Sequence, residues 1–299
     1  ETLAKLHFDY LKTWIRWSHE RGFRVRNQSH GAPANLLDLY GAVDLPETET
    51  FGSTPFPIPG LRRLDDEVRH DQDLPEPLMM RLASSAAHVM GRPLASSETC
   101  TWLREHWKVA LAYTKPEIDR LFVNGINHLL YHGTAYSPPD AAWPGWLFYA
   151  STQFNPQNTW WDDFPALNRY VARVQSFLQR GRPDHDLLLY WPIADVWDAE
   201  GPLMQQLAID DVKWMTASPC GKLAQRFIDR GYGFDFISDA QLLQTRIGSR
   251  RDGTRSDAVE TPGASYPMWT SIIVPKTRRM PVETLQQLLS LAAANTRVP

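Results

Sequence analysis

The first 180 or so residues alternate between short strands and helices, and this alternation constrains the fold more than any other feature. Apolar residues at helical spacing predict a helix over 3–21 that ends at Gly22. Strand-like and helical stretches then follow in turn at 23–31, 35–42, 43–52, 77–91, 92–102, 102–125, 126–138 and 164–181. Repeated strand–helix alternation predicts an α/β fold with a parallel sheet and covering helices.

Each predicted strand ends in polar residues. These are Gln28 and His30, then Asp44, Glu47 and Glu49, then Glu98, and finally His132 and Tyr136. In a (β/α)8 TIM barrel, the reactive groups sit at the carboxyl ends of the strands. Four strand units are too few to close such a barrel, so the residues alone predict either an open sheet or the second half of a barrel.

A second α/β unit is predicted after the linker "GRPDHD" at 181–186, which divides the chain into domains 1–182 and 183–299. A buried strand is expected over 187–197, helix and strand over 221–243, and strand and helix over 265–295. A stretch of low hydrophobicity at 245–263 predicts a mobile loop inside this unit, and a polar, proline-rich loop is expected over 53–76.

Composition excludes several classes of function. A net charge of -3 gives no electrostatic argument for nucleic acid or an anionic membrane as a partner, and no apolar run reaches membrane-spanning length. Cys100 and Cys220 fit neither a disulfide framework nor a zinc spacing, so we expect two free, buried thiols. The chain contains no GxSxG, Walker or GxGxxG motif. Its first residue is Glu1 and no signal peptide precedes the fold, so we expect a processed or excised chain. These residues do not indicate the cellular compartment of the protein.

Carboxylates at neighbouring strand ends suit glycoside hydrolysis, in which one acid protonates the leaving oxygen and a second carboxylate activates water or attacks the sugar. The candidates are Glu98, in "RPLASSETCTW", and Glu47, in "PETE". Strand alternation puts Glu47 and Glu49 on the same side, where they could also hold Ca²⁺. A simpler account makes Glu98 an acid in the first turn of a helix that Ser96 or Ser97 caps.

The chain is rich in aromatic residues, with 12 Trp, 12 Phe and 10 Tyr. Several cluster in "WPGWLFYAS" at 143–151, which contains Trp143 and Trp146. Indole rings often stack on flat apolar faces such as those of sugars. Ordinary packing of the loop after the last strand explains these two tryptophans nearly as well.

Three long segments closely resemble glycoside hydrolase family 106, the α-L-rhamnosidases. They are "HGAPANLLDLYGAVDLPETETFG", "RPLASSETCTW" and "NGINHLLYHGTAYSPPDAAWPGWLFYAS". The resemblance spans roughly residues 1 to 200. It implies a β/α-barrel catalytic domain, inversion at the anomeric carbon and a calcium ion at the active site. The part after residue 183 resembles the flavodoxin-like or glutamine-amidotransferase-like module that follows the barrel in related large glycosidases.

The resemblance also implies roles for single residues. Glu98 matches the carboxylate on the seventh barrel strand and would be the general base. Glu47 and Glu49 would contact sugar or calcium, Glu49 being the candidate metal ligand. The general acid is expected upstream, so Glu47 is not assigned as the acid even though Asp44 and Glu47 read as Asp-x-x-Glu. Candidate substrate contacts are Gln28, His30, Asn35, Asp44, His132, Tyr136, Trp143 and Trp146.

The expected function is removal of terminal α-L-rhamnose from rhamnosides or rhamnose-containing polysaccharides, in a periplasmic or secreted bacterial protein. Two alternatives stay open. One is a retaining β-galactosidase-like enzyme with Glu98 as nucleophile, and the other is a carbohydrate-binding module without turnover. Half a barrel leaves sheet edges exposed, so we expect residues 1–299 alone to be poorly soluble or inactive without the upstream segment that completes it.

Overall fold

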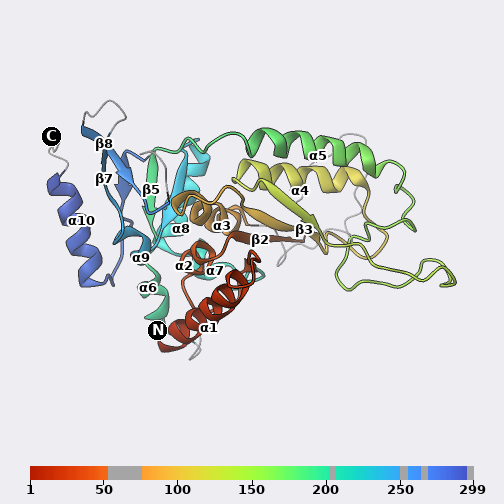
Figure 1. The fold of residues 1–299 in the computed structure, drawn as a ribbon, viewed down its shortest axis with the longest axis horizontal. Coiled ribbons are helices and arrows are strands. Elements are labelled where there is room, and N and C mark those ends of the chain that lie inside the picture. The colour runs from red at the N-terminus through yellow and green to blue at the C-terminus, as the bar shows by residue number, and fades with distance from the viewer. Residues whose placement is uncertain (53–75, 202–205, 250–254, 264–268, 295–299) are drawn as a thin grey trace.

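The computed structural model describes residues 1–52, 76–201, 206–249, 255–263 and 269–294. Two parallel sheets and their helices lie side by side along the long axis of the molecule, with helix α3 between them (Figure 1). The mixed α/β architecture that the alternation predicts is confirmed. Among the described helices, none combines the length and the apolar character needed to cross a membrane.

The first sheet contains four parallel strands in chain order, β1-β2-β3-β4. Its register places Gln28 opposite Glu47, and Glu49 opposite Glu98. The strands are β1 (Arg26–Gln28), β2 (Leu45–Phe51), β3 (Ser96–Thr101) and β4 (His128–Tyr131). The helices of this part are α1 (Thr2–His19), α2 (Leu36–Ala42), α3 (Pro77–Val89), α4 (Leu111–Val123) and α5 (Phe164–Leu178).

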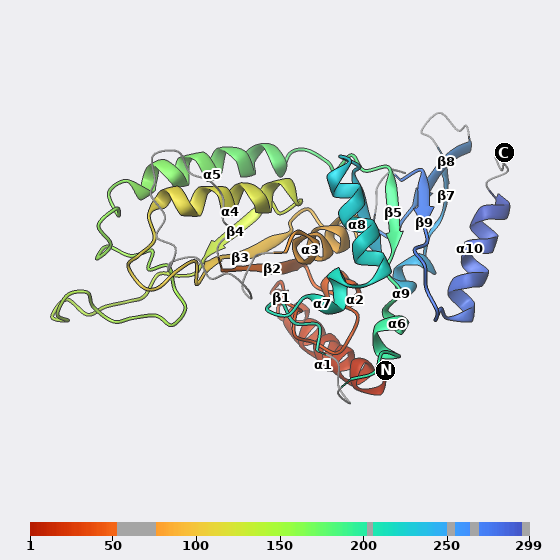
Figure 2. The same cartoon turned by 180° about the vertical axis from the view of Figure 1, so that it is seen from behind.

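The second sheet contains three parallel strands in the order β6-β5-β9, so the first of them in the chain lies in the middle. The strands are β5 (Leu187–Tyr190), β6 (Phe234–Ile237) and β9 (Ser271–Ile273). The helices are α6 (Ile193–Trp197), α7 (Lys213–Thr216), α8 (Pro219–Asp229), α9 (Asp239–Leu242) and α10 (Val282–Ala294), and Figure 2 shows them from behind. The strand expected over 187–197 is thus shorter than predicted, because Pro192 ends it and α6 follows.

The prediction of a loop at 245–263 is wrong. This stretch contains two antiparallel strands, β7 (Arg246–Ser249) and β8 (Arg255–Glu260). Ile247 and Val259 face each other across the pair and pack with the fully buried Trp269, so two apolar side chains suffice to anchor an otherwise polar hairpin. The loop predicted over 53–76 lies outside the described residues except for Glu76, which caps α3 by accepting a hydrogen bond from the backbone N–H of Leu78.

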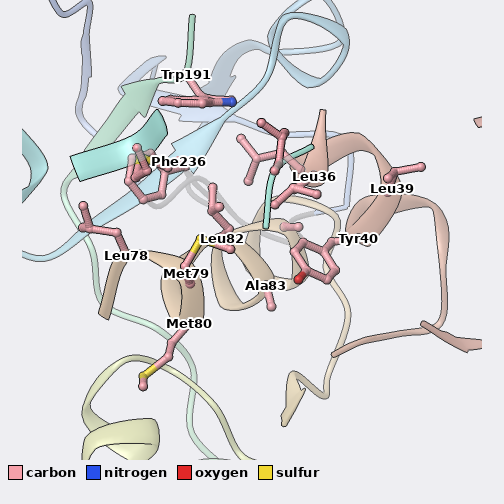
Figure 3. Close-up of a cluster of buried hydrophobic side chains, with 14 of the residues drawn as sticks. Leu36, Leu39, Tyr40, Leu78, Met79, Met80, Leu82, Ala83, Trp191 and Phe236 are labelled. Atoms are coloured by element: carbon pink, nitrogen blue, oxygen red, sulfur yellow. The ribbon is translucent and has the colours of Figure 1, made fainter. Parts of the chain in front are cut away.

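Helix α3 is buried on almost every side because both sheets pack against it. On one side, the Thr48 hydroxyl of β2 donates to the Met79 carbonyl. On the other, the Ser85 hydroxyl accepts from the backbone N–H of Phe236 in β6. Such a position is expected for a helix whose faces are mostly apolar, and the two buried serines of α3, Ser84 and Ser85, are both hydrogen-bonded. Figure 3 shows Leu78, Met79 and Leu82 of α3 in one cluster with side chains from both parts of the chain, among them Leu36, Leu39, Trp191 and Phe236.

The largest buried cluster therefore draws on residues from both sides of the expected boundary at 182/183. The division into domains 1–182 and 183–299 stays a prediction. Cys100 and Cys220 are both free and buried, which confirms the expectation from their spacing.

Candidate active site

Polar side chains collect on one face of the first sheet, toward the carboxyl ends of its strands. Successive side chains of a strand point to opposite faces. Thr48 points toward α3, so its neighbours Glu47 and Glu49 point to the other face. The register brings Gln28 and Glu98 to that same face. The sequence-predicted residues Gln28, Glu47, Glu49 and Glu98 are thus neighbours.

Glu98 is the carboxylate with the best-defined surroundings. Its Oε1 lies 2.6 Å from Nδ1 of His132, and its Oε2 accepts a hydrogen bond of 2.5 Å from Nε2 of Gln28. The side chain is still 31% exposed, so a small molecule can reach it. The hydrogen bond from His132 outweighs the effect of burial and lowers the pKa of Glu98 below its ordinary value, with a smaller contribution from Gln28.

His132 is held with both ring nitrogens against acceptors. Nδ1 faces the carboxylate of Glu98, and Nε2 lies 3.0 Å from the carbonyl oxygen of Tyr149. A ring that donates from both nitrogens is an imidazolium. Burial lowers the pKa of His132, but its contacts with Glu98 and the Tyr149 carbonyl outweigh burial and raise it. The geometry and both pKa directions therefore favour the charged pair of Glu98 and His132.

Glu47 occupies a different environment, because its side chain is only 5% exposed. It lies 3.3 Å from the guanidinium of Arg26 and accepts hydrogen bonds from the Ser96 hydroxyl at 3.0 Å and from Gln28 at 3.2 Å. Burial raises the pKa of Glu47 despite the nearby cation. The same amide nitrogen of Gln28 binds both Glu47 and Glu98, so Glu47 supports the group that positions Glu98.

The carboxylate of Glu49 contacts the imidazole of His30. Its Oε2 lies 3.2 Å from Nε2 of His30, and both side chains are largely buried. Calcium takes six to eight oxygen ligands, and an imidazole nitrogen is a poor substitute. Among the described residues, the one cluster of metal-ligating groups is elsewhere, at His88, His185 and Asp235. The described side chains around Glu49 thus do not by themselves fit a calcium site, and calcium there stays a prediction.

Two predicted substrate contacts, Asn35 and Asp44, make hydrogen bonds outside this cluster. Asn35 is buried and caps α2, its amide oxygen accepting from the backbone N–H of Leu37. Asp44 lies at the amino end of β2, where it binds His19 at 2.8 Å and accepts a hydrogen bond from the Val25 N–H. Because β2 begins at Leu45, Asp44 precedes the strand, and the prediction that it lies at the strand's polar end is wrong.

The remaining predicted contacts lie in the long segment after β4. Tyr136, Trp143 and Trp146 are 72%, 72% and 60% exposed. Tyr136 packs edge-to-face on Trp146, and Trp143 lies beside Trp107. This segment extends away from both sheets in Figure 1. The structure therefore places these rings on an exposed arm, without a contact to Glu98 among the described residues.

The backbone after Glu98 holds the end of that segment, around residues 150–152, against the sheet. Cys100 and Trp102 have φ values of 69° and 42°, a region that side chains other than glycine rarely adopt. The turn lets the Cys100 carbonyl accept from the Thr152 hydroxyl and the Trp102 N–H donate to the Ala150 carbonyl. These bonds fix residues 149–152, and with them the Tyr149 carbonyl that binds His132. Such strain is typical of functional sites.

Sequence reasoning missed Arg26, Ser96 and the Tyr149 carbonyl. Arg26 and Ser96 stand two positions before Gln28 and Glu98, so strand alternation would have placed them on the same face. The Tyr149 carbonyl has no comparable signal, because a loop brings it into place. Taken together, the described residues offer one accessible, deprotonated and oriented carboxylate, which can activate water or attack an electrophilic carbon.

Comparison with known proteins gives three findings. The model of glycoside hydrolase family 106, described as alpha-L-rhamnosidase, matches residues 65–299. A protein of Formosa agariphila named "Putative beta-glucuronidase" is 35% identical over 111 residues, which are 37% of this chain and 9% of that protein. The solved structure of a rhamnosidase from Novosphingobium sp. PP1Y superposes with a TM-score of 0.64 at 18% identity, covering 95% of this chain and 24% of that one. This chain thus spans a small part of the length of either protein.

Proposed function

The chain belongs to glycoside hydrolase family 106, the α-L-rhamnosidases, and we propose on this premise that it carries part of an active site that hydrolyses terminal α-L-rhamnosides. The observation that carries the proposal is the state of Glu98. It is accessible, its pKa is low, and His132 and Gln28 hold both of its oxygens. A carboxylate kept deprotonated at neutral pH suits a base or nucleophile and not a general acid.

Our proposal makes Glu98 the general base of an inverting reaction. In that reaction one carboxylate takes a proton from water while a second carboxyl group protonates the leaving oxygen. His132 and Gln28 would position Glu98. When Glu98 accepts the proton from water, the imidazolium of His132 would still donate to its Oε1 and keep the group in place.

Glu47 does not suit the role of general acid, although burial raises its pKa. Glu47 and Glu98 bind the same amide nitrogen of Gln28, so they lie closer together than the roughly 6.5–9.5 Å that separate the carboxyl groups of an inverting pair. The carboxylate of Glu47 is also already bound by Arg26, Ser96 and Gln28. We propose that the acid comes from a part of the parent protein outside this chain. No step here depends on calcium.

We further propose that the first sheet is the second half of a (β/α)8 barrel. Four parallel strands in chain order with intervening helices suit that arrangement. The polar face that carries Glu98 would then point into the barrel mouth. The second sheet, ordered β6-β5-β9, suits a flavodoxin-like module.

The substrate is tested with the full-length protein and three aryl glycosides. We expect release of the aryl group from the α-L-rhamnoside and little from the β-D-glucuronide or β-D-galactoside. The glucuronide is included because a relative named for that activity matches 111 residues at 35% identity. A protein that cleaves the glucuronide and spares the rhamnoside would contradict the proposal.

Proton NMR of the first-formed sugar tests the stereochemistry. Inversion gives β-L-rhamnose first, because water attacks the face opposite the leaving group. If α-L-rhamnose appears first, the reaction is retaining and Glu98 is better described as the nucleophile. Tight binding of rhamnose without any release of product would favour a binding module.

A further inference from the structure

The second sheet carries a cavity that takes no part in the site around Glu98. Its volume is about 950 Å³, which lies in the range of small-molecule sites. Residues after β5 form one side and residues after β9 form the other, among them Trp191, Asp195, Lys276 and Arg278. The amino end of α8, at Ser218–Cys220, closes a third side.

The position of this cavity in the fold is informative. β5 lies in the middle of the sheet, and the chain proceeds first to β6 on one side and later to β9 on the other. The carboxyl ends of β5 and β9 thus border the point where the strand order reverses. Open parallel sheets bind their ligands in the crevice at this point.

The wall of the cavity combines an apolar face with unpaired positive charge. The indole of Trp214 is fixed by a hydrogen bond of 2.9 Å to the Ala208 carbonyl and packs edge-to-face on Trp191. Lys213 and Lys276 also line the cavity, and neither ammonium group pairs with a carboxylate among the described residues.

The acidic groups of the wall are already engaged by backbone donors. Asp195 accepts hydrogen bonds of 3.0 and 2.7 Å from the N–H groups of Arg278 and Arg279, which also pins the loop after β9 against α6. Asp211 accepts from the N–H of Lys213. These bonds leave both aspartates charged, but the lining carries three cationic side chains, Lys213, Lys276 and Arg278, against the two carboxylates. The net positive charge of the lining favours an anion, and the amino end of α8 adds to it.

We propose that this cavity binds an acidic sugar, with its carboxylate at Lys213 and Lys276 and the apolar face of its ring against Trp214. The choice of a sugar as the body of the ligand rests on the proposed function and on Trp214, whose indole offers an apolar surface on which a sugar ring of the glycan can stack. The anionic group follows from the cavity alone.

The test is calorimetric titration of the full-length protein with D-glucuronate, D-glucose and inorganic phosphate. Glucuronate should bind about tenfold or more tightly than glucose, which lacks the charge, and than phosphate, which lacks the ring. The double variant Lys213→Glu/Lys276→Glu should bind glucuronate about tenfold more weakly. Lys222→Glu, which changes an exposed lysine of α8 outside the cavity, should bind as the parent does.

Three results would overturn the proposal: no binding of glucuronate, equal binding of glucose, or a double variant that binds as well as the parent. Phosphate that binds as tightly as glucuronate would show a plain anion site and contradict the sugar part. The cavity belongs to the second sheet and Glu98 to the first, so hydrolysis of the aryl rhamnoside by the parent protein is measured separately from glucuronate binding. If the parent protein does not hydrolyse the aryl rhamnoside, the proposed function is contradicted, while the glucuronate-binding result still stands.

Discussion

At the scale of single residues, the same side chain type takes opposite roles on neighbouring strands. Glu98 keeps 31% of its side chain exposed and has a lowered pKa, while Glu47 is buried and has a raised one. Because both residues end neighbouring predicted strands, the sequence predicted that they would border one pocket. It could not predict which of them stays accessible, because that depends on Arg26, Ser96 and the loop that carries Tyr149.

The other predicted site residues differ in whether they contact Glu98, and their position relative to the strands decides this. Gln28 and His132 reached Glu98 as the strand-end pattern suggested. Asp44 did not, because it precedes β2 and lies at the amino end of that strand. Asn35 caps a helix, a local role that asparagine often has and that competes with any role at a site.

Changing His132 should move the pH dependence of the reaction. His132→Gln removes the cation that lowers the pKa of Glu98, so the base should become protonated at a higher pH. The acidic limb of the kcat profile should therefore shift to higher pH. Gln28→Ala should shift it less, because the hydrogen bond from Gln28 contributes less. The control His128→Gln alters a histidine on β4 that does not bind Glu98; an equal shift there would refute the assignment.

At the scale of elements, strand–helix alternation predicted every strand and major helix of the first sheet. It failed for elements whose stability comes from a few tertiary contacts. The four-residue helices α7 and α9 are too short to show periodicity. The β7–β8 hairpin looks polar in sequence, yet Ile247 and Val259 bury their side chains against Trp269.

Helix α3 offers a direct test of packing between the two sheets. Ala83 is fully buried in α3, so Ala83→Leu adds volume where no space exists. We expect it to lower the free energy of unfolding by about 1–3 kcal/mol, measured by urea denaturation. Ala172→Leu makes the same change on the exposed side of α5 and should alter stability by less than about 0.5 kcal/mol. Equal effects of the two changes would mean that α3 is not tightly enclosed.

At the scale of the whole molecule, a buried carboxylate links the two parts of the chain. Asp235 of β6 binds Nδ1 of His88 in α3 at 2.8 Å and Nδ1 of His185 in the linker at 2.9 Å, and it accepts from the indole N–H of Trp269. Burial opposes its ionisation, but the two histidines outweigh burial and lower the pKa of Asp235. No sequence motif signals this contact, because its members come from four separate segments.

Removing the Asp235 carboxylate should destabilise α3 and the second sheet together. A lowered pKa means that the contribution of Asp235 is present at neutral pH and is lost only as the pH falls through the folded-state value, in strong acid. At pH 7, Asp235→Ala should cost about 3–5 kcal/mol, since the buried indole N–H of Trp269 and two partly buried imidazoles lose their partner. Hydrogen exchange should then speed up in α3 and in β6 alike. The exposed Asp184→Ala serves as the control, and faster exchange confined to β6 would show that the parts are not coupled.

If Glu98 is the reacting carboxylate, Glu98→Gln in the full-length protein should nearly abolish rhamnoside hydrolysis. The amide has the size of the carboxylate but cannot take a proton, so kcat should fall by about 10²–10⁴-fold while the circular dichroism spectrum stays unchanged. A folded Glu98→Gln variant with a rate near that of the parent would contradict the account.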